Sequence, residues 1–540
     1  MRFSAFVLAI LLACPGPAPA KQPRPPVCTP GRFVVQGGQL LASIADSASL
    51  TIGDGTAAIG AGCPFGVSRI ARPKRTSTLT AFWKICTGIA RVRVKARFDA
   101  ACDTLTGAVT GKKQKRQKFT ATRSRCGDGI VDAGAGEACD GATGCTAPLH
   151  CSAACACVGD PGSRDTSFGS SGVATVGNAG MPFLAFGLGV QPSGSIIVAG
   201  GFNTLMADGG IGVARFTADG QLDPTFGAGG WTLTKPIPAI DFMSDMKVLP
   251  DGRILVAGRT GFGDNRVIVR YDADGHPDPL FGVGGTATFD SDSCYEVEPL
   301  LSVAPSGAVY AAFPDVGCTN PDFKARFVRL TESGAVDPGF DLKFNYPVTF
   351  SVVRPDERVA IATVVHPPDS VQLFEPTGLP VLSFGTGGMV FPSFGTSSAG
   401  GARLFADAGS RLVAITGAPT PAGAGFALER WTADGGDDQS FGSMGRVVTV
   451  GSSDEYALGL SFDATGRLVV VGSGPAALLV RRYADDGTLD TTFGVGTVAV
   501  PGMQGVDVAV LPDGKIIVLG RQMPAMGDPY RYGVLMRLWP

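Results

Sequence analysis

The stretch Asp223-Pro224-Thr225-Phe226-Gly227-Ala228-Gly229-Gly230 is the fullest copy of a phrase that the chain repeats seven times. Its phenylalanine recurs at spacings of 58, 55, 59, 44, 57 and 52 residues. Self-similarity at such a period is typical of propellers and other repeat arrays. The repeat therefore predicts an architecture built from similar units, but it does not predict a reaction. The repeated residues are Phe168, Phe226, Phe281, Phe340, Phe384, Phe441 and Phe493.

One repeat unit divides into four short apolar runs, which we predict to be strands at 241–250, 253–258, 267–271 and 285–289. Asp-Gly pairs such as Asp251-Gly252 separate the runs, because glycine accepts the positive φ of a tight turn. Seven copies of four strands predict an all-β protein with a seven-bladed β-propeller over residues 161–540.

The two ends of this region predict how the ring closes. The run Gly172–Val176 has no three-strand unit before it, and the final copy ends at Tyr532–Leu538 with no fourth strand after it. We therefore expect these two strands to pair, which removes two unpaired sheet edges at once.

The pattern LDxxFGxGG…PDGxIxVAG…RYxxDG resembles the delta-60 repeat, a family of secreted bacterial β-propellers without an assigned activity. The resemblance covers about 375 residues and implies the fold alone. The stretch from Phe340 to Phe384 departs most, because Asp341 replaces the glycine and Glu375-Pro376-Thr377-Gly378 replaces Ala-Asp-Gly. We expect that blade to be irregular.

The N-terminus predicts export. Residues 1–13 carry one arginine and then a nearly unbroken apolar run, and Ala18-Pro19-Ala20 has the form of a cleavage site. We predict a signal peptide over residues 1–20, a proline-rich linker over 21–27 and a secreted protein. Alternatively, Leu11-Leu12-Ala13-Cys14 resembles a lipobox, which would make Cys14 the anchor of an outer-membrane lipoprotein. Other apolar stretches are too short to predict a transmembrane segment.

The cysteines agree with an oxidising compartment. Apart from Cys14, four lie in residues 28–125, six in 126–160 and two in the propeller. Even counts predict disulfides closed within each module, including one between Cys294 and Cys318. The alternative for the six clustered cysteines is a zinc site, although Cys155-Ala156-Cys157 lacks the usual spacing.

The cysteine-rich module, residues 126–160, has too few apolar residues to bury a core. Its segments Cys126-Gly127-Asp128-Gly129-Ile130-Val131-Asp132 and Gly136–Gly141 resemble the cysteine-rich repeat of secreted myxobacterial proteins. Four acidic residues crowd residues 128–140 of this module. They are either ordinary surface carboxylates or the ligands of a calcium site. Its candidate ligands are Asp128, Asp132, Glu137 and Asp140.

Residues 28–125 form a basic β-domain, with 17 Lys and Arg against four Asp, while the chain from Cys126 onward carries a net charge of about −18. Polar and apolar residues alternate from Arg91 to Phe98, which predicts a strand with one buried face. We predict a small antiparallel β-sandwich or barrel.

On that strand Arg91, Arg93, Lys95 and Arg97 share one face, and such a row suits a regularly charged polyanion. The alternative is an edge strand that positive charge protects against aggregation. The row lacks interleaved aromatics, which argues against stacking on single-stranded nucleic acid. The expected partners are acidic polysaccharide, lipopolysaccharide or extracellular DNA bound without sequence specificity, or a protein, including the chain's own propeller.

Catalytic signals are weak. The three histidines, His150, His276 and His366, predict no Ser-His-Asp triad, and the expected inner strands share no repeated acid, His or Arg. The sequence favours a secreted, monomeric, non-enzymatic surface or matrix protein that uses its propeller as an interaction scaffold, without a cofactor. The alternative is a propeller hydrolase or lyase acting on extracellular carbohydrate. Convergent carboxylates in the central channel would favour the enzyme.

Overall fold

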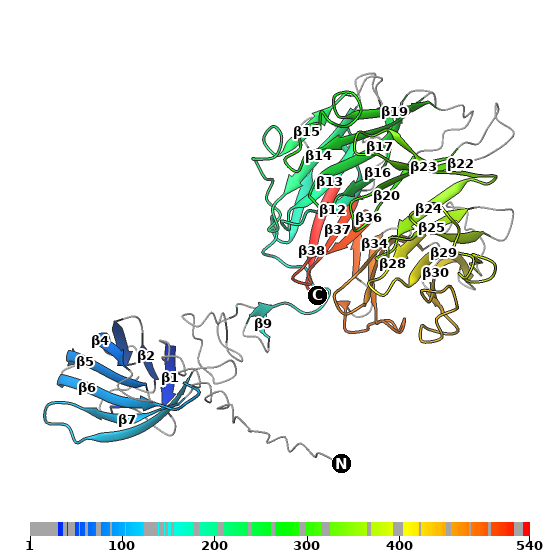
Figure 1. Cartoon of the computed structure of the whole chain (residues 1–540). Helices are drawn as coiled ribbons and strands as arrows, with labels where there is room; N and C mark the ends of the chain where they lie inside the picture. The colour runs from blue at the N-terminus through cyan, green and yellow to red at the C-terminus, as the bar shows by residue number, and fades with distance from the viewer. Residues whose placement is uncertain are drawn as a thin grey trace, which may run out of the picture. The chain divides into compact units, whose positions relative to one another are not determined.

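The structure is a computed structural model, and the chain divides into two compact units, Met1–Val158 and Gly159–Pro540. Both are built from strands (Figure 1). The residues it describes are 31–35, 40–41, 49–52, 55–59, 63–71, 77–86, 89–102, 104–123, 139, 145, 149–152, 156–177, 183–202, 210–235, 240–260, 265–290, 299–314, 325–363, 369–392, 403–420, 423–449, 455–474, 477–494, 498–522 and 533–540.

The basic domain is a closed barrel of eight strands. Each strand pairs antiparallel with the next, and β1 pairs with β8, so the sheet has no edge. Of the two architectures predicted from the sequence, the structure has the barrel. Its strands are β1 (Gly31–Val35), β2 (Ser49–Ile52), β3 (Thr56–Ile59), β4 (Cys63–Ala71), β5 (Thr78–Cys86), β6 (Ile89–Phe98), β7 (Thr104–Thr110) and β8 (Gln117–Arg123).

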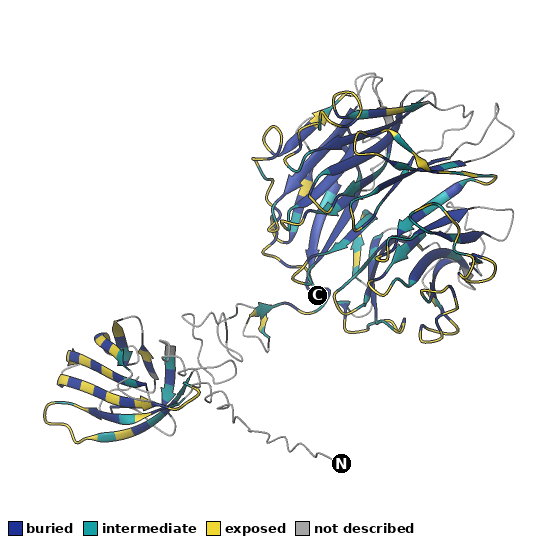
Figure 2. Cartoon of the chain, viewed as in Figure 1, coloured by how far each residue is buried: buried dark blue, intermediate teal, exposed yellow. Residues whose placement is uncertain are grey.

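Side chains fill the barrel interior. Residues of β4, β5 and β6 alternate between buried and exposed, which gives the striped strands of Figure 2. Val92 and Val94 point inward to a core that includes Trp83, whose indole Nε1 donates to the Cys63 carbonyl at 3.0 Å. A disulfide between Cys63 and Cys86 joins β4 to β5. The alternation therefore places the charged side chains of these strands on the outer face of the barrel.

Disulfides crosslink the cysteine-rich module, as predicted from its composition. Cys139 is bonded to Cys151 and Cys145 to Cys157, both pairs 12 residues apart. The short strands β9 (His150–Cys151) and β10 (Cys157–Val158) pair antiparallel between them. Since the bonded sulfurs carry no free thiolate, these four cysteines are not available as zinc ligands.

The second unit is a seven-bladed propeller of four-stranded antiparallel sheets, as predicted (Figure 1). The first four blades are β12 (Phe183–Val190), β13 (Ile196–Phe202), β14 (Gly210–Phe216) and β15 (Trp231–Thr234); β16 (Ile240–Val248), β17 (Ile254–Thr260), β18 (Asn265–Tyr271) and β19 (Thr286–Asp290); β20 (Leu300–Val303), β21 (Val309–Pro314), β22 (Ala325–Leu330) and β23 (Val336–Phe344); and β24 (Val348–Val353), β25 (Val359–Thr363), β26 (Ser370–Phe374) and β27 (Met389–Val390). The last three are β28 (Arg403–Ala406), β29 (Leu412–Thr420), β30 (Gly423–Trp431) and β31 (Arg446–Thr449); β32 (Tyr456–Phe462), β33 (Leu468–Ser473), β34 (Ala477–Tyr483) and β35 (Val498–Pro501); and β36 (Met503–Val510), β37 (Ile516–Gln522) and β38 (Gly533–Leu538) with β11 (Val173–Val176).

Ring closure follows the prediction. Strand β11 pairs antiparallel with β38, from Val173 opposite Met536 to Val176 opposite Gly533. The N-terminal strand of the unit is thereby the outermost strand of the seventh blade. Both unpaired edges are removed without a separate fastening element.

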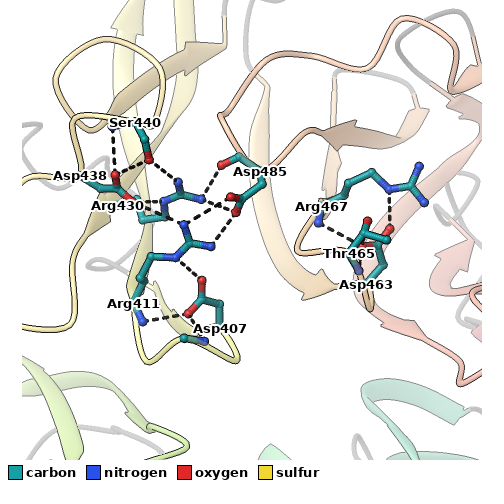
Figure 3. A network of polar contacts seen from close by, with 10 residues as sticks. Asp407, Arg411, Arg430, Asp438, Ser440, Asp463, Thr465, Arg467 and Asp485 are labelled. Atoms are coloured by element: carbon teal, nitrogen blue, oxygen red, sulfur yellow. Dashed lines mark hydrogen bonds and ion pairs between the residues drawn. The ribbon is translucent and has the colours of Figure 1, made fainter.

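The repeated phrase builds the joints between blades. In the fifth blade, Arg430 Nε donates to Asp438 at 2.8 Å, and its guanidinium lies 4.4 Å from the ring centroid of Phe441. Arg430 Nη1 also donates to the Asp485 carbonyl of the next blade at 2.6 Å (Figure 3). The same pair recurs as Arg215–Asp223, Arg270–Asp278, Arg329–Asp337, Arg482–Asp490 and Arg537–Asp165. The phrase is therefore structural.

The fourth blade has Leu373 and Val381 in place of this pair, and Arg354 compensates. Arg354 enters from the turn after β24, and its Nη1 donates to the Ala433 carbonyl of the fifth blade at 2.7 Å. Asp356 accepts from Nη2 of Arg354 at 2.6 Å. The blade predicted to be irregular is a complete four-stranded sheet with a substitute joint.

The replacement of the repeat glycine by Asp341 changes the outermost strand of the third blade. Strand β23 runs through Phe340 and Asp341 without the turn found in other copies, and the Asp341 carboxylate accepts from Nε and Nη2 of Arg326 at 2.8 and 2.9 Å. A non-glycine residue avoids the positive φ of that turn, so the chain stays extended.

Among the described residues, no helix is long and apolar enough to cross a bilayer. The predicted signal peptide, the linker and Cys14 lie outside the described part of the chain.

Candidate functional site

The innermost strands of all seven blades surround a hollow of about 870 Å³. Consecutive inner strands, from β12 to β36 and back to β12, contact one another around the ring. Most of the described residues that line the hollow are apolar, and Lys247 is the one charged side chain among them. Each blade contributes one residue to an apolar ring: Val190, Val248, Val303, Val353, Ala406, Phe462 and Val510.

Three inner strands also carry a charged residue that does not line the hollow, and we call these three residues the charged layer. Asp245, Arg403 and Asp507 each lie nine residues before the start of the next strand of their blade. Each binds the main chain of the following blade: Leu301 N donates to Asp245 at 2.8 Å, Leu188 N to Asp507 at 3.4 Å, and Arg403 to the Leu458 carbonyl at 2.7 Å. These charges join neighbouring inner strands.

The electrostatics of this layer follow from burial. Asp507 lies deep among protein atoms, although its side chain keeps part of its accessible surface. This burial raises its pKa to about 6. Four groups oppose the rise: the Val508 amide, Lys247, the Leu188 amide and Arg403. Burial lowers the pKa of Arg403, opposed by Asp507 and Asp245. Asp245 accepts from the Lys247 ammonium at 2.5 Å. Both carboxylates thus have partners within the protein.

The sequence argument missed this layer. It treated the inner strands as apolar because no acid or arginine repeats in them, whereas three blades carry single charges at one shared register position. Counting nine residues back from each second strand would have found all three. The hollow itself is not lined by Asp245, Arg403 or Asp507.

On the barrel, the predicted cationic row lies on the outward face of β6. Arg91, Arg93, Lys95 and Arg97 are all exposed, and the residues between them are inward and buried or nearly so. Arg91 has a φ of 55°, so the regular spacing of an extended strand applies from Arg93 to Arg97. Within the described residues, none of the four is in an ion pair.

The interpretation of this row as a protected edge is wrong. Strand β6 pairs with β5 on one side and β7 on the other, and the barrel is closed. An internal strand has no unpaired backbone groups to shield, so the positive charge needs another explanation.

Apolar side chains stand beside the row, on neighbouring strands. Phe82 lies opposite Arg93, whose guanidinium is 5.9 Å from the ring centroid, and Val67 lies opposite Phe82. Phe65, two residues along β4, is 92 % exposed. The absence of interleaved aromatics holds along β6 alone, because strand pairing supplies them from β4 and β5.

Other predicted site residues lie outside the described part of the chain. These residues are Cys294 and Cys318, the predicted propeller disulfide, and the four candidate calcium ligands Asp128, Asp132, Glu137 and Asp140. The disulfide and the calcium site remain predictions.

Comparison with known proteins agrees with the fold. The family model "Domain of unknown function (DUF5122) beta-propeller" matches residues 191–226, 249–281 and 464–493. Each matched segment begins near the first turn of a blade and ends at an anchor phenylalanine, which is Phe226, Phe281 or Phe493. No curated protein matches the chain.

Several solved structures resemble the chain at low identity. A virginiamycin B lyase from Staphylococcus aureus is 10 % identical with a TM-score of 0.40, covering 67 % of this chain and 98 % of its own. The polysaccharide lyase Uly1 is 10 % identical with a TM-score of 0.40, covering 69 % and 93 %. The propeller domain of the Trilobed protease from Pyrococcus furiosus is 9 % identical with a TM-score of 0.39, covering 63 % and 89 %. At this similarity their activities carry no argument for this chain.

Proposed function

We propose that the chain is a secreted, non-enzymatic binding protein of a bacterial surface or matrix. The propeller is a rigid interaction scaffold, and the basic barrel binds extracellular polyanions. The observation that carries the proposal is that Arg93, Lys95 and Arg97 are exposed side by side on an internal strand of a closed barrel.

Further exposed cations of the barrel lie near the row on β6 and enlarge the positively charged surface. The β7–β8 turn is joined to β6 by the Lys112 amide, which donates to the Ala90 carbonyl at 2.9 Å. Asp99 is the one acid among the described barrel residues. A polyanion that crosses this surface gains entropy by releasing counterions, without base or sugar specificity. The exposed cations of the turn and the start of β8 are Lys112, Lys113, Lys115, Arg116 and Lys118.

Binding of dextran sulfate and of duplex DNA to the full secreted chain tests the proposal. We expect affinity at low salt that falls steeply as salt is added. Replacing Arg91, Arg93, Lys95 and Arg97 with glutamine is expected to weaken binding while the circular dichroism spectrum is unchanged, because all four side chains are exposed. Indifference of binding to these changes would contradict the proposal.

One observation favours a second candidate, a propeller hydrolase or lyase acting on extracellular carbohydrate. Burial raises the pKa of Asp507 to about 6, a value suited to a general acid. Against it, Asp507 accepts from two backbone amides, Val508 at 2.8 Å and Leu188 at 3.4 Å, and it does not line the hollow. Turnover of an acidic polysaccharide that Asp507→Asn abolishes would establish this candidate.

The compartment is part of the same proposal. Crosslinks in the barrel and the cysteine-rich module suit an oxidising space, and the apolar leader suits export. We propose a secreted monomer, with an outer-membrane lipoprotein anchored through Cys14 as the alternative. Mass spectrometry of the mature N-terminus distinguishes cleavage after Ala20 from a lipidated Cys14.

A further inference from the structure

The outward face of β4, β5 and β6 holds an apolar cluster with cations beside it. Phe65, Val67 and Phe82 form the cluster, with exposed fractions of 92, 68 and 37 %. Val67 and Phe82 are directly opposite across the β4–β5 pair. We call these three residues, together with Arg69, Lys84 and Arg93, the amphipathic face.

Each of β4, β5 and β6 places one cation of the amphipathic face next to the cluster. Arg69 follows Val67 at the next outward position of β4, and Lys84 follows Phe82 at the next outward position of β5. Arg93 lies opposite Phe82 on β6. All three cations are exposed, so their long side chains are able to reach around apolar matter while the charges stay in water.

This composition separates an anionic lipid surface from a dissolved polyanion. A polysaccharide or nucleic acid needs cations and flat rings to stack on, and an aliphatic side chain such as Val67 adds little to stacking. A contiguous apolar cluster on a soluble domain instead marks a surface that another apolar phase covers. Cations around apolar side chains match the boundary between phosphate headgroups and acyl chains.

We infer that the amphipathic face binds anionic lipid layers, with Phe65, Val67 and Phe82 entering the acyl boundary and the surrounding cations contacting headgroup phosphates. This inference rests on the proposed polyanion-binding function and names its ligand class. It assigns the β6 row to the approach to the charged surface and the apolar cluster to retention on it.

The test is sedimentation of the full secreted chain with vesicles of phosphatidylcholine, with and without phosphatidylglycerol. We expect binding to the anionic vesicles. The triple variant Phe65→Thr, Val67→Thr, Phe82→Thr keeps every charge. We expect it to bind these vesicles at least about tenfold more weakly, because moving each apolar side chain from water into the acyl layer is favourable. It should bind dextran sulfate as the parent does.

A matched control removes exposed apolar surface elsewhere. Leu280 and Val283 in the second blade are 75 and 89 % exposed, and replacing both with threonine should leave vesicle binding unchanged. A depth readout is independent of affinity: in Phe65→Trp the new indole should be quenched by brominated acyl chains and shift its emission to the blue.

The outcomes separate the two proposals. Equal vesicle binding by the triple variant and the parent, with dextran sulfate binding retained, would overturn the lipid inference and leave polyanion binding standing. A parent that binds neither vesicles nor dextran sulfate would contradict both. Loss of dextran sulfate binding in the triple variant would assign the cluster to the polymer site and so overturn the inference.

Discussion

Arg537, in the last strand of the chain, donates from Nε to the carboxylate of Asp165 at 2.8 Å across a sequence separation of 372 residues. In five other blades the equivalent arginine and aspartate are eight residues apart. The seventh blade makes the same joint from the two ends of the propeller unit. The local motif of one repeat is therefore also the device that closes the ring.

Asp165→Asn is expected to weaken ring closure. Asp165 and Arg537 are both almost fully buried. Burial pushes the pKa of Asp165 upward, but hydrogen bonds from Ser167 and Lys515 and the charge of Arg537 outweigh it and lower the pKa. Asparagine leaves the buried Arg537 charge with the exposed Asp219, 3.5 Å from its Nη1, as its remaining counterion, at a cost of about 3 kcal/mol. Urea unfolding followed by circular dichroism measures the loss.

Asp223→Asn is the matched control, because Asp223 makes the same bond to Arg215 inside the first blade. Its side chain is more exposed than that of Asp165, so water compensates more of the loss and the expected cost is smaller. Equal costs for the two variants would mean that closure adds nothing to the stability of the joint.

The substitute joint of the fourth blade predicts a rescue. Arg354→Met removes the donor to the Ala433 carbonyl and to Asp356, and we expect a loss of about 1–3 kcal/mol, because hydrogen bonds of a charged and buried side chain are lost. Adding Leu373→Arg and Val381→Asp restores the pair found in other blades, so part of the loss should return. Thermal unfolding of the single and triple variants measures both steps. A triple variant less stable than Arg354→Met would contradict the equivalence of the two joints.

The sequence predicted the fold well because the fold depends on repeated, local signals. Anchor phenylalanines recur at each blade, turn glycines such as Gly252 recur in five of the seven, and strand alternation marked the outward row of β6. The joint of Arg354 was not predictable in this way, because its partner Ala433 lies 79 residues away and the motif positions themselves had been lost.

The candidate sites were harder to predict because they depend on which strands become neighbours. Phe82 and Arg93 are adjacent only through the β5–β6 register, and the status of β6 as an internal strand depends on the pairing of β1 with β8. Asp245 and Asp507 are single substitutions at one position of a repeat, so periodicity conceals them.

Asp507→Asn is expected to change how stability depends on pH. The pKa of Asp507 is raised to about 6 in the folded protein, above its value of about 4 when unfolded, so the folded state binds more protons between these values. The stability that Asp507 contributes is therefore complete below about pH 4 and is lost as pH rises through 6. Asparagine stays neutral, so the variant should gain stability relative to the parent by on the order of 2 kcal/mol between pH 4 and 7. Unfolding midpoints across this range that keep a constant difference would show that Asp507 does not carry the shift.

Salt dependence of DNA binding distinguishes a site on β6 from the net charge of the barrel. One variant replaces Arg91, Arg93, Lys95 and Arg97 with glutamine, and its matched control replaces Lys112, Lys113, Lys115 and Lys118, so both lose four charges. Each contacted phosphate contributes about 0.9 to the slope of log affinity against log salt, so we expect the β6 variant, which loses four cations, to lose up to about 3.6 units of slope. The turn variant should lose less, because Lys112, Lys113 and Lys115 lie at one end of the row, where the Lys112 amide meets the Ala90 carbonyl, and β7 separates Lys118 on β8 from the row. Fluorescence anisotropy of labelled duplex DNA from 50 to 200 mM salt gives both slopes. Equal losses would assign binding to overall charge and remove the special role of β6.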